Sequence, residues 1–241
     1  MKHYLEAAIV LILLLPAGGM AQNDATRYMD AAQGSALLYR GHKAFTYTQA
    51  FNGTYFWSDP AFETGEVVYN GKRYSGVLLN VDAARQDLLV KTPTGELYKV
   101  LASAYVDRFS MGGRQFFNLK KRFGGSAPDG YWELLHDGRA KAFKQVRRTL
   151  QQDLDGHLRT GMGYEGGNYN PKIHNIFLYS VSYCYVSEEG RIVPIRRRGQ
   201  LLNQYKDKKR EIKRHLAALE RNRSLNFEQF CKEVLSYAES L

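Results

Sequence analysis

Short runs of β-forming residues separated by turn residues constrain the fold of this chain more than any other feature of its sequence. The first eight runs lie at residues 36–39, 45–51, 66–69, 73–81, 87–91, 97–101, 105–109 and 115–119. Between two of these runs, Asn70-Gly71 accepts the positive φ angles of a type I′ turn and predicts the tip of a β-hairpin. This spacing is typical of an antiparallel meander.

The β pattern continues through the middle of the chain. A run at 131–135 is followed by a turn at 136–138, and residues 176–186 alternate between an aromatic face and a Ser/Cys face before a hairpin partner at 191–195. Residues 139–158 are ambiguous, because apolar residues there also have helical spacing. We interpret this segment as a strand up to about Arg148.

Helical signals dominate from Gly199 onward. Asp207 is positioned to cap a helix with an apolar stripe at Ile212 and Leu216, and Asn226 with Gln229 forms a capping box for the last helix. We therefore predict an α+β protein: an antiparallel β-meander or partly closed β-barrel, with a C-terminal helical hairpin packed on it.

The N-terminus reads as an export signal. Residues 1–21 combine a basic start, an apolar run of about ten residues and small residues before Gln22, which predicts a cleaved secretory signal peptide. An uncleaved anchor is the alternative. The expected organisation is a signal peptide at 1–21, an N-terminal segment at 22–34, a β-rich domain at 35–198 and the helical hairpin at 199–241, with no transmembrane span in the mature chain.

Composition limits the class of protein. The 241 residues include 44% apolar residues and two cysteines, so the chain can form a core and is neither a disordered protein nor a disulfide scaffold. The net charge of +10 favours anionic partners. Export permits a bond between Cys184 and Cys231, but buried free cysteines are an equally ordinary interpretation.

Basic residues concentrate near the C-terminus. Residues 196–223 hold eleven basic and three acidic residues, which predicts a positive face suited to an acidic protein, a lipid headgroup or an acidic polysaccharide. A solvated helix surface is the alternative. Export disfavours nucleic acid as the partner. The candidate binding residues are Arg196, Arg197, Arg198, Lys206, Lys209, Arg210, Lys213 and Arg214.

Aromatic residues suggest a second candidate site. Tyr55, Trp57, Tyr131 and Trp132 form a possible platform for stacking on a ligand, although aromatic residues equally suit strand faces.

Catalytic motifs are weak. Residues 161–166 match a dinucleotide-binding pattern by letters alone, and the flanking sequence does not place them between a strand and a helix. The histidines are not spaced as metal ligands, so we expect neither a metal nor a cofactor, and no catalytic residue is assigned. A hydrolase that acts on an envelope polymer remains the alternative, with His136, Asp137, Asp155 or His157 in its site.

Several segments resemble a group of exported, uncharacterised proteins of Bacteroidota. The resemblance involves residues 37–41, the hairpin at 65–74 with the runs at 78–82 and 87–90, and residues 205–212 with Asn226-Phe227. It implies a periplasmic or outer-membrane-associated location and carries over no catalytic residue. We therefore expect a non-catalytic cell-envelope protein that binds a protein partner or an anionic ligand, as an accessory subunit of an outer-membrane complex in one form of this hypothesis.

Overall fold

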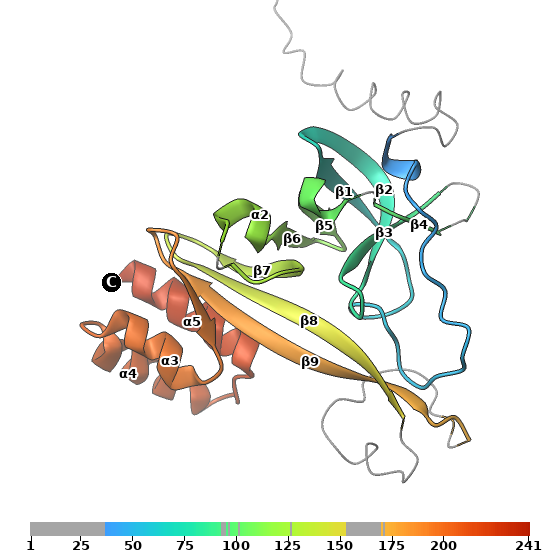
Figure 1. The fold of residues 1–241 in the computed structure, drawn as a ribbon. Helices are drawn as coiled ribbons and strands as arrows, with labels where there is room; N and C mark the ends of the chain where they lie inside the picture. Colours follow the sequence, from blue (N-terminus) through green and yellow to red (C-terminus); the bar gives the residue numbers. More distant parts are fainter. Residues whose placement is uncertain are drawn as a thin grey trace, which may run out of the picture.

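The computed structural model describes residues 37–92, 95, 97–100, 102–125, 127–152, 170 and 172–241, which form a ten-stranded antiparallel sheet with helices near the C-terminus (Figure 1). The strands are β1 (Glu63–Tyr69), β2 (Lys72–Asp82), β3 (Asp87–Lys91), β4 (Leu97–Lys99), β5 (Val106–Met111), β6 (Arg114–Asn118), β7 (Tyr131–Asp137), β8 (Lys141–Gln152), β9 (Asn175–Val186) and β10 (Ile192–Ile195). The helices are α2 (Leu119–Phe123), α3 (Arg198–Leu202), α4 (Lys209–Glu220) and α5 (Phe227–Ser240), with short 3₁₀ turns at Leu37–Tyr39, Ser103–Tyr105 and Asn203–Tyr205.

The strand order shows two meanders fused into one sheet. The order is β10-β9-β8-β7-β6-β5-β1-β2-β3-β4, and the two meanders meet where β5 pairs with β1. Because β4 and β10 lie at opposite edges, the sheet is not closed into a barrel. The predicted α+β class is confirmed, in its antiparallel open form with a helical C-terminus.

The first half of the sheet curls around a core of its own (Figure 1). Val67, Leu79 and Phe109 are buried within it, and all belong to one apolar cluster. The turn after β2 contacts β8, because the Arg148 amide donates to the Ala83 carbonyl at 3.2 Å. These contacts attach the curled half of the sheet to β8.

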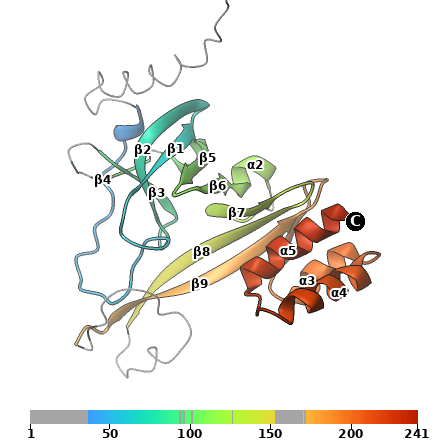
Figure 2. The same cartoon turned by 180° about the vertical axis from the view of Figure 1, so that it is seen from behind.

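The second half of the sheet, β7–β10, is covered on one face by α3, α4 and α5, as the two views in Figures 1 and 2 agree. Leu135 of β7 and Tyr185 of β9 pack there with Val234 of α5. The opposite face carries a separate apolar cluster that includes Phe143 and Cys184. This half of the sheet therefore buries apolar side chains on both faces, which positions the site described below.

The ambiguous segment is a strand. β8 pairs with β9 from Lys141 to Gln152, beyond the predicted end near Arg148. Phe143 and Val146 belong to different apolar clusters on opposite faces of the sheet. A strand buried on both faces places apolar residues three positions apart, and this produces the spacing that also suits a helix.

Two predicted strands are wrong. Leu37–Tyr39 is a 3₁₀ turn whose side chains fill the first core without any strand pairing. Residues 45–51 are not a strand, because their rings pack on one another and on a distant strand: the ring centroids of Phe51 and Phe177 are 4.9 Å apart. Their apolar alternation reflects this aromatic cluster.

Turn and cap signals were mostly correct. Asn70 and Gly71 have φ angles of 49° and 74° at the β1–β2 tip, as the type I′ turn requires. The α5 capping box is present, with the Asn226 side chain accepting from the Gln229 amide at 2.8 Å. The Asp207 cap is wrong: the residue before α4 is Lys208, whose backbone is already helical and makes no side-chain cap.

The predicted signal peptide, the segment at 22–34 and the glycine pattern at 161–166 lie outside the described residues. Within the described part of the chain, no helix has the length and hydrophobicity needed to cross a bilayer.

Candidate functional site

The predicted aromatic platform does not exist as one surface. Tyr131 and Trp132 are consecutive residues of β7 and face opposite sides of the sheet, in different apolar clusters. Trp57 is buried against Phe116 in the first core, with ring centroids 5.1 Å apart. Tyr55 belongs to the aromatic cluster around residues 45–56. Trp132 alone of the four predicted residues lines the cavity described next.

The predicted basic residues also divide between two places. Lys206, Arg210, Lys213 and Arg214 are exposed on or beside α4, whose buried side carries Ile212 and Leu216. The others are Arg196, Arg197, Arg198 and Lys209, of which Arg198 pairs with Glu220 at 2.5 Å and Lys209 donates to Asn203 Oδ1 at 2.7 Å. Arg196 is exposed, follows β10 directly and lines a cavity to which no residue of α4 contributes.

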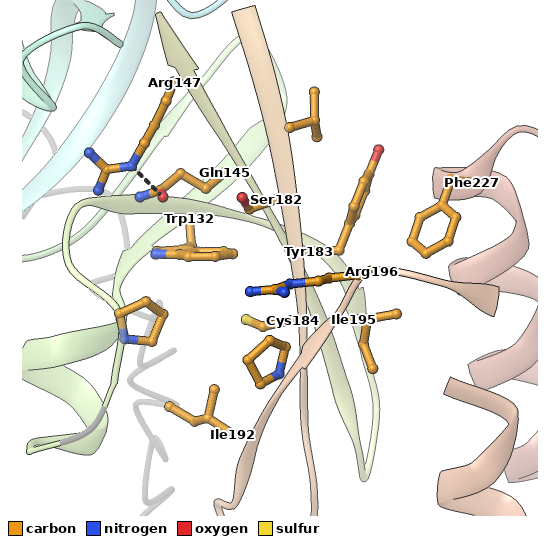
Figure 3. Close-up of a pocket in the computed structure, with 13 residues that line it drawn as sticks. Trp132, Gln145, Arg147, Ser182, Tyr183, Cys184, Ile192, Ile195, Arg196 and Phe227 are labelled. Atoms are coloured by element: carbon orange, nitrogen blue, oxygen red, sulfur yellow. Dashed lines mark hydrogen bonds between the residues drawn. The ribbon is translucent and has the colours of Figure 1, made fainter. Parts of the chain in front are cut away.

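Arg196 and Trp132 meet in a cavity of about 550 Å³, which we call the Trp132 cavity (Figure 3). It lies beside the end of β10, where the pairing of β10 with β9 stops at Ile195 and Tyr183. The lining residues come from β7, β8, β9, β10 and the start of α5: Pro128, Trp132, Gln145, Arg147, Val181, Ser182, Tyr183, Cys184, Ile192, Pro194, Ile195, Arg196 and Phe227.

The lining is apolar with a positive rim. Trp132 is only 4% exposed, and its indole N–H already donates to the Asp129 carbonyl, so the ring face is what it offers to the cavity. In Figure 3 the Arg196 side chain extends toward this ring. Aromatic faces attract guanidinium groups and flat ligands.

Two guanidinium groups line the Trp132 cavity, from Arg147 and Arg196. Arg147 is held in place: its Nε donates to Gln145 Oε1 at 2.9 Å, and its Nη2 donates to the Asp129 carbonyl at 3.3 Å. Among the described lining residues none carries a carboxylate. An arginine pair without a facing acid is suited to bind a carboxylate or phosphate.

The cavity lacks a reactive nucleophile within its described lining. Burial raises the pKa of the Cys184 thiol to about 12, so the group is a neutral thiol at physiological pH and a poor nucleophile. Burial likewise raises the pKa of Cys231 to about 12. The two cysteines are free and belong to apolar clusters on opposite faces of the sheet, so they are not disulfide partners in this fold.

A second cavity of about 480 Å³, the Lys144 cavity, is lined partly by the same segment of β9. Both cavities share Val181, Tyr183 and Phe227. The remaining lining residues of the Lys144 cavity are Trp57, Ser58, Arg114, Lys144, Val146, Arg148, Tyr179, Asn226 and Glu228. Residues of β9 therefore line both cavities.

Lys144 organises the polar part of the second cavity. Its Nζ lies 3.0 Å from Glu133 Oε2 and 2.9 Å from Glu228 Oε2, so it joins β7, β8 and α5. Burial lowers the pKa of Lys144, but the two carboxylates more than offset this, and the pKa is raised. Burial raises the pKa of Glu228, but hydrogen bonds and charge attraction from Lys144 and Lys232 together more than offset it, so that pKa is lowered. These charges are already neutralised and hold the helix to the sheet.

The residues proposed for a hydrolase do not assemble into one site among those described. His136 Nε2 lies 3.4 Å from Glu239 Oε2, and its Nδ1 lies 3.4 Å from Ser236 Oγ. Glu239 also accepts from the Ala140 amide at 3.3 Å, which fixes the end of α5 on the β7–β8 turn. Asp137 instead pairs with Lys141 on the surface. Asp155 and His157 lie outside the described residues.

Sequence reasoning missed Arg147, Gln145, Ser182 and Phe227. Alternation along β8 was the available signal, because Gln145 and Arg147 point to the same side of a strand. The ambiguous helical spacing concealed it.

Comparison with protein-family models, with curated proteins and with solved structures finds no match to this chain.

Proposed function

We propose that this chain is an exported, non-catalytic cell-envelope protein that binds an anionic group of an envelope partner in the Trp132 cavity. One observation carries the proposal: Arg147 and Arg196 line the same apolar hollow, and no described lining residue supplies a counter-charge. Export and envelope location rest on the N-terminal sequence pattern and on the resemblance to exported Bacteroidota proteins. The role fits an accessory subunit of an outer-membrane complex.

The nature of the cavity favours binding over chemistry. Its described lining combines aromatic, aliphatic and guanidinium groups, and its thiol is neutral because burial raises the pKa of Cys184 to about 12. Guanidinium groups recognise anions by charge and by paired hydrogen bonds. The exposed basic residues of α4 contribute long-range attraction to the same anionic partner.

Charge reversal tests the proposal directly. Binding of fluorescein-labelled poly-L-glutamate is measured by anisotropy for the parent chain and for Arg147→Glu/Arg196→Glu. Because a hydrogen bond to a charged group contributes about 1.5–3 kcal/mol, we expect roughly 10- to 100-fold weaker binding. The matched control, Lys213→Glu/Arg214→Glu, makes the same change of charge on α4, where both residues are exposed.

The control decides the location of the site. A small, salt-sensitive loss of binding affinity in the α4 variant agrees with long-range attraction. Equal losses in both variants, or a loss confined to the α4 variant, overturn the cavity as the site. Anionic lipid vesicles and an acidic polysaccharide are assayed in parallel to identify the class of anion.

A further inference from the structure

The Trp132 cavity lies beside a stretch of sheet edge that no strand of the described residues covers. β9 pairs with β8 over its whole length, but on its other side β10 covers only residues 183–186. Farther along the strand, Asn52 forms a single parallel bridge to Ile176. Between these contacts no described strand pairs with residues 178–182 on that side. Ser180, Val181 and Ser182 are accordingly three consecutive exposed residues within a ten-stranded sheet.

The backbone direction along β9 follows from the Asn52 contact. The Phe177 amide donates to the Asn52 carbonyl at 2.9 Å, and the Asn52 amide donates to the Asn175 carbonyl at 2.8 Å. Odd-numbered residues of β9 therefore direct their N–H and C=O groups away from β8, because strand residues alternate in direction. By the same alternation the N–H and C=O of Val181 face the open edge.

The Trp132 cavity and the Lys144 cavity both border this edge, close enough for the side chains of one added strand to reach both. The two cavities share Val181 as a lining residue, and this residue is 36% exposed. Successive side chains of an extended strand point to opposite faces. A strand added beside Val181 would therefore direct alternate side chains into the two hollows, which is the usual basis of specificity in strand addition.

Charge indicates the composition of such a strand. Arg147 and Arg196 line the Trp132 cavity without a described carboxylate. In the Lys144 cavity, Lys144 is paired with Glu133 and Glu228 and Arg114 with Glu63, so among the described residues the positive charge without a facing acid lies in the Trp132 cavity. A basic side chain would be repelled in the Trp132 cavity, and an acidic side chain would be attracted there.

We propose that residues 178–182 of β9 are a docking edge for an extended acidic segment of a partner protein, which adds to the sheet as a strand and places an acidic side chain in the Trp132 cavity. The inference rests on the proposed function and names its partner class. Unpaired edges are usually protected in natural sheets, so an open stretch bordered by two lined hollows is suited to a partner strand.

The test uses a fluorescein-labelled heptapeptide in which Glu and Val alternate, with a Lys-Val peptide as the charge control. Val181→Pro removes the N–H that faces the edge and leaves the hydrogen bonds between β8 and β9 in place, and edge strands tolerate proline at such positions. Val181→Thr keeps the N–H and the branched side chain as the matched control. We expect about tenfold weaker peptide binding for Val181→Pro, from the loss of a backbone hydrogen bond, and less than about twofold change for Val181→Thr.

Modified peptides test the same point on the unmodified protein. One peptide carries N-methyl groups on its odd-numbered backbone nitrogens, and a second peptide carries them on its even-numbered ones. Strand addition predicts that one set abolishes binding and the other leaves it unchanged, because only one set faces β9. Equal tolerance of both sets overturns strand addition, whether or not Val181→Pro folds.

The outcomes separate this inference from the function on which it rests. If Arg147→Glu/Arg196→Glu abolishes binding while Val181→Pro and both methylated peptides bind normally, the anion site stands and the docking edge is wrong. If neither acidic probe binds the parent chain, the proposed function fails first. A parent chain that sediments as a dimer, and as a monomer when Val181 is proline, would assign the edge to a second copy and overturn the partner segment.

Discussion

Among the polar contacts between helices and sheet, Lys144 links α5 to β7 and β8. The side chain of Glu133 is 8% exposed and that of Lys144 is 17% exposed, so this ion pair is shielded from water. Glu228 of α5 completes the network from the helical side. A shielded cation between two carboxylates contributes little by its presence, but its removal leaves both acids without their shared partner.

Replacement of Lys144 by Met tests this network. Breaking a fully buried ion pair by removing one partner costs about 3–5 kcal/mol, and because Lys144 is only partly buried we expect the free energy of unfolding to fall by about 2–3 kcal/mol. Urea denaturation followed by circular dichroism measures it. Lys141→Met is the control, because its partner Asp137 is 62% exposed and such pairs contribute about 0–1 kcal/mol. Similar losses in both variants would contradict the account.

The same groups predict how stability depends on pH. Burial raises the pKa of Cys184, Cys231 and Tyr183 to about 12, and the net effect on Lys144 is also a raised pKa. Groups with a raised folded-state pKa stabilise fully below their unfolded pKa, and this contribution is lost as pH rises. The lowered pKa of Glu228 acts in the opposite direction, so its contribution is lost as pH falls.

We therefore expect the free energy of unfolding to be nearly constant between about pH 6 and 8, to decrease above about pH 9, and to decrease again below about pH 5. Denaturation series across this range measure the profile. Stability that rises from pH 8 to pH 11 would contradict the assigned burial of the thiols and the phenol.

At the scale of elements, local signals predicted most strands and the start of α5, and failed where tertiary contacts decide. Asn70-Gly71 and the Asn226 box carry their own backbone geometry, so the sequence alone predicts them. Residues 45–51 have the alternation of a strand, but their rings pack as a cluster around Phe177, which is distant in the sequence. Pattern reasoning has no access to that contact.

The candidate site was unpredictable for the same reason. Arg147 and Arg196 are far apart in sequence and meet only because β8, β9 and β10 pair in one register. The sequence shows that the segment around Arg196 is basic. It does not show that Arg196 lies apart from the basic residues of α4. Trp132 was chosen with Tyr131, although a strand directs neighbouring residues to opposite faces.

Removal of the α5 cap is the test at this scale. Asn226→Ala removes the side-chain acceptor for the Gln229 amide and should lower the free energy of unfolding by about 1 kcal/mol. Asn222→Ala, at an exposed position after α4, is the matched control with an expected change within about 0.5 kcal/mol. Thermal denaturation compares the two. Equal effects would show that the capping box does not stabilise α5 in the folded protein.

The whole molecule combines a curled half with its own core and a flatter half covered by helices on one face. The Trp132 cavity and the open edge of β9 both lie in the flatter half, where β10 ends. In the function we propose, the excess of positive charge attracts an anionic partner over a distance, and the two guanidinium groups select where it docks. Position, charge and open backbone groups thus converge on one part of the sheet.

Amide hydrogen exchange, resolved by residue and measured with and without the Glu-Val heptapeptide, tests the docking of an acidic strand on β9 most directly. We predict at least about tenfold slower exchange at Val181 on binding, since its N–H gains a hydrogen bond, and no change at Lys213 or Arg214 on α4. Protection confined to α4, or bound peptide without slower exchange at Val181, would contradict the docking of an acidic strand on β9.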